Sequence, residues 1–122
     1  MTITPDGSAA IHHSEKAFEA IRAVNHRTLG ATIPAPIAYD ILSNLTGLGR
    51  GLPQALSQLA TGLQRSLQVY DLHDDIGTDP AETIRIAMTH LARAGALADQ
   101  LERELAHAQT AISVQGYIDH GW

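Results

Sequence analysis

The chain of 122 residues is long enough for one domain whose hydrophobic core needs no disulfide or metal, and its 44% hydrophobic content is typical of a globular protein and argues against global disorder. It contains no cysteine, which excludes a disulfide framework, a thiol nucleophile and a Cys-ligated zinc site. Thirteen acidic residues against eight basic ones give a net charge of −5, and the basic residues are scattered from Lys16 to Arg103. Direct nucleic-acid binding is not expected, because it needs a concentrated positive surface.

The apolar residues predict an all-α protein. Most of them are Ala and Leu, which favour helices, whereas the aromatic residues typical of strands make up only 4%. No apolar run of about eighteen residues occurs, so neither a spanning helix nor a membrane partner is expected. The first residues have neither the basic region nor the apolar stretch of a secretory signal. We therefore expect a cytoplasmic protein.

The predicted organisation is a flexible arm at 1–8, a single helical-bundle domain at 9–115 and a C-terminal tail at 116–122. The arm contains Pro5 and Gly7, and Asp6 or Ser8 is a suitable cap for a first helix. This helix is predicted to run to about Leu29, where Gly30 ends it. Its apolar positions are Ile11, Phe18, Ile21 and Val24.

Two helices are predicted between Pro36 and Tyr70. Proline suits the first turn of a helix, so the second helix should begin near Pro36. Three glycines, Gly47, Gly49 and Gly51, then predict a turn or a flexible kink. The third helix should begin near Pro53, and its apolar stripe has a helical period. The stripe consists of Leu52, Leu56, Leu59, Leu63, Leu67 and Tyr70.

The fourth helix has the clearest start in the chain. Asp79 is the predicted cap, Pro80 the first helical residue and Glu82 the reciprocal partner of a capping box. The helix is predicted to run to about Gln115. Before it, the third helix is predicted to end in the acidic segment 71–77, where Gly77 supplies a left-handed closing residue. Apolar residues recur along the fourth helix with a seven-residue period, which favours packing against another helix.

This heptad pattern predicts an interface. The expected fold is an antiparallel helical bundle of about four helices with a long C-terminal helix, closed within one chain or by a second copy as a dimer. The same stripes satisfy both arrangements. The predicted interface residues are Ile84, Leu91, Ala94, Ala98, Leu101, Leu105, Ala108 and Ile112.

An acidic segment between the third and fourth helices is the densest polar cluster. Its candidate metal or ligand residues are Asp71, His73, Asp74 and Asp75. Oxygen ligands of this type can hold a divalent cation, but the spacing lacks the central Gly and terminal Glu of a calcium loop. The favoured interpretation is a solvated turn, because aspartates stabilise turns and helix caps locally.

No catalytic motif is visible. The Glu104-Leu-Ala-His107 step resembles half of a di-iron ligand set, but a second copy is absent. Patterns of serine nucleophiles and of phosphate-binding glycine loops are also absent. We therefore expect a protein that is not an enzyme and needs no cofactor.

Two resemblances bear on function. Tyr70-x-x-x-Asp74 resembles the export signal of short two-helix secreted proteins, although their Trp-x-Gly turn is replaced by Leu48-Gly-Arg-Gly51. The segments 52–63, 78–82 and 108–117 are similar to small all-helical proteins of actinobacteria, some of which are linked to plasmid-like or integrative elements. That second resemblance implies a helical fold and carries no activity.

The expected function is a helical interaction, scaffold or accessory protein that self-associates or binds a partner protein. The heptad seam and the leucine stripe of the third helix motivate it. The alternatives are a ligand- or metal-responsive module that uses the acidic turn at 71–79, and a secreted protein of the helical-hairpin type.

Overall fold

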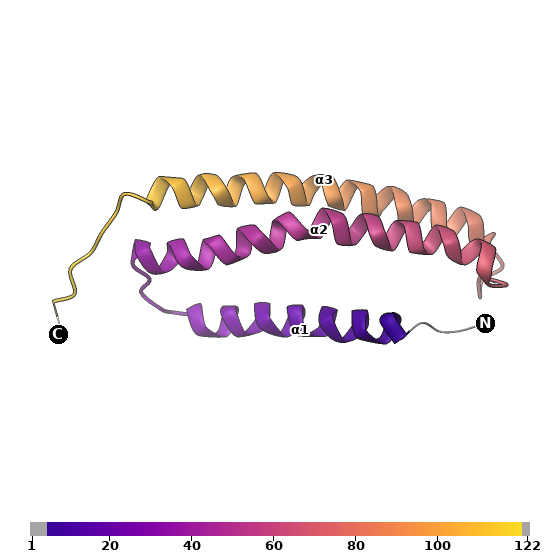
Figure 1. The fold of residues 1–122 in the computed structure, drawn as a ribbon, viewed down its shortest axis with the longest axis horizontal. Helices are drawn as coiled ribbons and strands as arrows, with labels where there is room; N and C mark the ends of the chain where they lie inside the picture. The colour runs from indigo at the N-terminus through magenta and orange to yellow at the C-terminus, as the bar shows by residue number, and fades with distance from the viewer. Residues whose placement is uncertain (1–4, 121–122) are drawn as a thin grey trace. The chain divides into compact units, whose positions relative to one another are not determined.

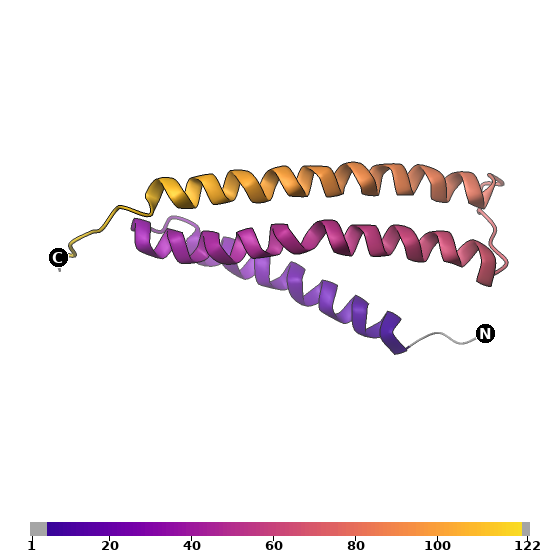
Figure 2. The same cartoon turned by 45° about the horizontal axis from the view of Figure 1, so that its top comes forward.

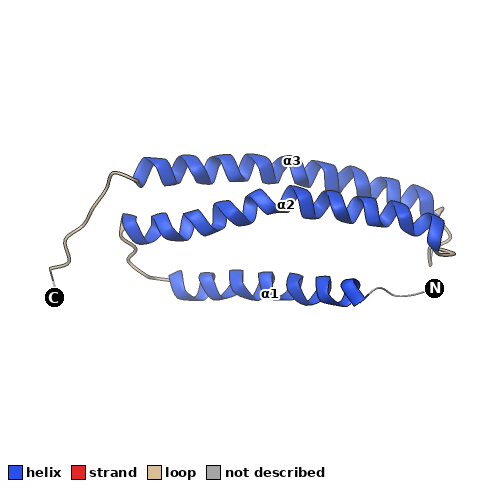
Figure 3. Cartoon of the chain, in the orientation of Figure 1, coloured by secondary structure: helices blue, strands red, loops and turns tan. Residues whose placement is uncertain are grey.

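The computed structural model describes residues 5–120, and over that range the chain is helical with no strand (Figure 1, Figure 3). The helices are α1 (Pro5–Thr28), α2 (Ala35–Val69) and α3 (Pro80–Ile112). The predicted all-α class is confirmed. The predicted number of about four helices is wrong, because α2 runs through the segment that was expected to separate two helices.

Helix α2 continues through its glycines and through Pro53 because that region packs against α3. Gly49 is buried, and a Cβ built on it would lie 3.6 Å from the Cα of Glu102. A glycine inside a helix costs about 1 kcal/mol relative to alanine, and a proline about 3 kcal/mol. Tertiary packing offsets such costs in many helices. The glycine-rich segment is therefore a place of close helix contact and not a turn.

The chain divides into two compact units, residues 1–34 and 35–122. The first unit consists of α1 and the connection after it. Helix α1 begins at Pro5, so residues 5–8 of the predicted arm are helical, while residues 1–4 lie outside the described residues. Its end agrees with the prediction, and Gly30 adopts a positive φ of 70° directly after it. The single domain predicted over 9–115 stays a prediction.

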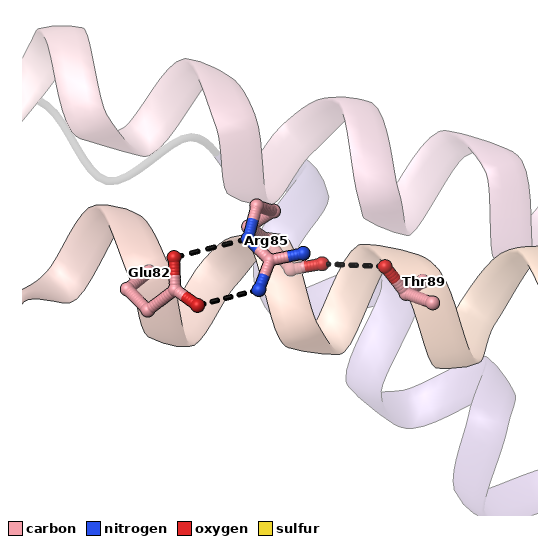
Figure 4. Close-up of polar contacts among 3 residues, drawn as sticks. All are labelled: Glu82, Arg85 and Thr89. Atoms are coloured by element: carbon pink, nitrogen blue, oxygen red, sulfur yellow. Dashed lines mark hydrogen bonds and ion pairs between the residues drawn. The ribbon is translucent and has the colours of Figure 1, made fainter.

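The second unit is an antiparallel hairpin of α2 and α3, which lie side by side along their length (Figure 2). The start of α3 is as predicted, since the Asp79 side chain accepts a hydrogen bond from the Ala81 backbone N at 3.1 Å. The capping box is only half formed. The Glu82 carboxylate accepts from the Arg85 guanidinium, with Nε to Oε2 at 3.0 Å (Figure 4).

Gly77 does not close α2, which ends eight residues earlier at Val69. It has a positive φ of 80° inside the loop, and its backbone N donates to the Asp74 carbonyl. Helix α3 ends at Ile112, slightly before the predicted Gln115, and Ser113 caps it. Residues 116–120 of the predicted tail lack regular structure, and its last two residues lie outside the described residues.

The core of the hairpin is thin. Among the residues whose side chains are described, the buried hydrophobic ones are Ala35 and Ala98, and no large side chain is fully buried. No helix in the described part of the chain combines the length and apolarity needed to cross a membrane. The contact between α2 and α3 is thus made by small residues and by the edges of half-buried leucines.

Candidate interaction surface

The seven-residue series on α3 lies at the contact with α2. Ala98 is buried, and the other members of the series are half-buried. These half-buried members are Ile84, Leu91, Leu105 and Ile112. The partner of this part of the predicted seam is therefore α2 of the same chain.

The second series of the predicted interface behaves differently. Ala94 is half-buried, but Leu101 is 47% exposed and Ala108 is also exposed. Each of these residues lies three positions after a member of the contact series, about 60° around the helix from it. The heptad pattern groups all three with Leu105, and the structure separates Leu101 and Ala108 from it.

The polar side of the hairpin is marked by Arg50 and Glu102. Arg50 Nη2 donates to Glu102 Oε1 at 3.1 Å, and the two residues belong to α2 and α3. On the same side, Gln109 Nε2 donates to the Tyr39 carbonyl at 3.3 Å. Both interactions form in the register in which Gly49 lies against Glu102 and Gly95 against Pro53.

The opposite side of the hairpin is apolar. Successive residues turn by about 100° around an α-helix. Gly49 faces α3, so Arg50 and Leu48 point to opposite sides of the hairpin. On α3, Ala98 faces α2. Glu102, four residues later, turns to the side of Arg50, and Leu101, three residues later, turns the other way.

We call this side the open face. It consists of one stripe of exposed or half-buried apolar residues on each helix. On α2, Leu48 is 40% exposed and Leu59 is 59% exposed. On α3, Leu97 is 64% exposed and Leu101 is 47% exposed. Its members are Ile37, Ile41, Leu48, Leu52, Leu59 and Leu63 on α2, and Leu97 and Leu101 on α3.

The exposure of Leu97 and of part of the α2 stripe was not predicted from the sequence. The apolar residues of α2 recur with a helical period, but that period does not distinguish the residues that face α3 from those beside them on the open face. The signal that could have found the open face is the width of the apolar arc. The apolar positions of α2 from Ile37 round to Leu42 span about 140° of the helix, wider than the stripe of about 100° that typically faces a core.

The acidic turn is held by hydrogen bonds within the loop. The Asp74 carboxylate accepts from the hydroxyls of Thr78 and Thr83. These bonds, that of Thr78 above all, lower the pKa of Asp74 below its usual 3.8. Asp79 is occupied as the cap of α3.

The four predicted ligand residues do not gather around a common point. His73 lies 3.6 Å from Asp75, both are highly exposed, and Asp71 is exposed as well. Within the described residues no three His, Cys, Asp or Glu side chains are grouped so that they could hold a metal ion. The geometry of this turn therefore does not support the metal-binding alternative.

Tyr70 and Asp74 lie in the loop between α2 and α3. In the two-helix secreted proteins that the sequence resembles here, the signal follows the second helix of the hairpin. The Tyr-x-x-x-Asp segment directly follows α2, the second helix in chain order, and precedes α3. The alternative of a secreted protein stays a prediction.

A shallow cleft of about 290 Å³ lies at the end of the hairpin, where α2 begins and α3 ends. Its titratable lining side chains are Tyr39 and Asp40. The remaining lining residues are Pro36, Ile112, Ser113 and Gln115. Within this lining, Tyr39 and Asp40 are the side chains of a type that can transfer protons.

Comparisons of the chain with protein-family models, with curated proteins and with solved structures gave no significant match.

Proposed function

We propose that this chain is a non-enzymatic helical interaction protein, with the open face as its binding surface. The observation that carries the proposal is the exposure of Leu97 and Leu101, in a hairpin that fully buries no large side chain in its described part. Burial of apolar surface contributes about 25 cal/mol per Å², so a face of this kind favours association.

The composition of α2 supports the same proposal. In 35 residues it has three charged side chains, Asp40, Arg50 and Arg65. A helix that meets water on three sides usually has a wide polar face. The proposal sets this interaction in the cytoplasm, a location that the absence of cysteine favours.

Two substitutions test the proposal by separating the open face from the contact inside the hairpin. Leu101→Asp places a charge on the open face, and Leu105→Asp places one between α2 and α3. We expect the first variant to keep its helical circular dichroism and lose association, since an unpaired charge in an interface is costly. The second should lose helical structure as well.

Binding of an apolar dye measures the exposure of the open face in a variant that is monomeric. The probe 8-anilinonaphthalene-1-sulfonate fluoresces on exposed hydrophobic surface. The proposal is contradicted if the wild-type chain neither associates nor binds the dye more strongly than Leu101→Asp does.

A further inference from the structure

Resting on the proposed function, we propose that the partner of the open face is a second copy of the hairpin, stacked face to face with its ends reversed. In this arrangement α3 of one copy lies antiparallel on α3 of the other, and α2 on α2. The result is a symmetric four-helix bundle whose core is made by the two open faces.

The dimensions of the open face fit a second hairpin. From Ile37 to Leu63 it is about 40 Å long, at 1.5 Å per residue. Two helices about 9 Å apart give it a width of about 18 Å. This is on the order of 700 Å² per copy, close to the roughly 800 Å² that each partner buries in a standard interface. A single added helix, about 10 Å across, would cover about half of that width.

The stripe on α2 is symmetric about its middle. Ile37 and Leu63, Ile41 and Leu59, and Leu48 and Leu52 form three pairs, each centred on Arg50. A twofold axis that crosses α2 at this level brings the members of each pair opposite one another in the two copies. Isologous interfaces need this self-complementarity.

The charges at the edge of the open face have nearly the same centre. Arg93 and Glu104 are exposed on α3. Around the helix they lie further from the contact with α2 than Leu97 and Leu101 do, so they flank the outer edge of the open face. Their midpoint lies between Ala98 and Asp99. Antiparallel stacking about that point sets Arg93 of each copy beside Glu104 of the other.

The two centres coincide in the hairpin, which is the observation that selects this arrangement. Glu102 lies against Gly49, and Gly95 lies against Pro53. The level of Arg50 on α2 therefore falls between Gly95 and Glu102 on α3, where the charge midpoint also lies. One twofold axis thus satisfies the leucine pairs of α2 and the opposite charges of α3 together.

Charge reversal tests the pairing. Arg93→Glu and Glu104→Arg each create two like-charged pairs per dimer, and we expect each to raise the dimer Kd about tenfold at low salt. The double variant restores opposite charges, and its Kd should return to within about threefold of the wild-type value. Arg103→Glu is the matched control, since this exposed arginine of α3 turns towards the polar side and should change Kd less than threefold.

Spin labels test the reversal of the ends. The chain has no cysteine, so Ala81→Cys gives one label at the start of α3. Ends-reversed stacking predicts a label distance of about 50 Å, twice the length of helix between Ala81 and the axis. A distance below about 25 Å would mean that like ends meet, and it would overturn the arrangement.

The outcomes separate this inference from the proposed function. A dimer that Leu101→Asp dissociates, but that the charge reversals do not weaken, overturns the arrangement and leaves the proposed function standing. A monomer whose dye binding depends on Leu101 shows that the partner is not a second copy, and it leaves the proposed function standing. A monomer without such dye binding overturns both.

Discussion

Arg50 and Glu102 pair across the hairpin at 3.1 Å, on the side away from Leu48 and Leu101. The arginine side chain is 71% exposed and the glutamate 24% exposed, so solvent screens the pair. We predict that Arg50→Ala lowers the free energy of unfolding by less than about 1 kcal/mol. It should leave association unchanged, because Arg50 lies outside the open face. Urea unfolding and the solution mass check the two statements, and loss of the dimer in this variant would contradict the assignment of sides.

Thr46 has a buried hydroxyl. The residue is 4% exposed, and its Oγ1 has no hydrogen-bond partner among the described residues. A buried polar group without a partner costs about 1–3 kcal/mol. We predict that Thr46→Val, which keeps the shape and removes the hydroxyl, raises the free energy of unfolding by about 1 kcal/mol.

Thr61→Val is the matched control for that substitution. Thr61 lies on the same helix, is exposed, and its Oγ1 donates to the Ser57 carbonyl at 3.1 Å. Its replacement should change stability by less than about 0.5 kcal/mol. Equal effects of the two substitutions in denaturant unfolding would show that the buried hydroxyl is not the cause.

Two glycines should respond in opposite directions to alanine. A Cβ added at Gly47 meets nothing within 4 Å, and the residue is helical, so Gly47→Ala should stabilise the chain by about 0.5–1 kcal/mol. Gly77 has a φ of 80°, which an alanine adopts at a cost of roughly 1–2 kcal/mol. Thermal unfolding of the two variants shows whether each substitution raises or lowers the stability. A stabilised Gly77→Ala would contradict the loop conformation.

Asp74 should contribute to acid sensitivity. Its pKa is lowered because the hydroxyl of Thr78, and then that of Thr83, donates to the carboxylate. A depressed pKa in the folded state stabilises the protein fully above the unfolded value of 3.8, and this contribution is lost as the pH falls through the folded value. We predict that Asp74→Asn weakens the dependence of the unfolding midpoint on pH below about pH 4. An unchanged acid slope in this variant would contradict the hydrogen-bonded loop.

Two ends of the helices could be predicted from sequence because local chemistry sets them. Asp79 and Pro80 mark the start of α3, and Gly30 follows the end of α1, as their capping and backbone preferences require. The continuity of α2 could not be predicted in this way. Gly49 breaks a helix by intrinsic propensity, and its contact with Glu102, more than fifty residues away in the chain, outweighs that tendency.

The division of the apolar residues between two sides of the hairpin was also beyond the sequence. Leu101 and Leu105 belong to one heptad pattern, and only the position of α2 decides which of them is covered. That position depends on the register in which Gly49 packs on Glu102 and Gly95 on Pro53, contacts between residues far apart in the chain. Self-association through the predicted residues, and their assignment as an interface, stay predictions.

The most direct test of the central claim is the mass of the full chain in solution, measured by light scattering across a range of micromolar concentrations. Association through the open face predicts twice the mass of one chain for the wild type, and a single-chain mass with retained helicity for Leu101→Asp. A wild-type chain with a single-chain mass at every concentration, and with dye binding equal to that of Leu101→Asp, would contradict the claim.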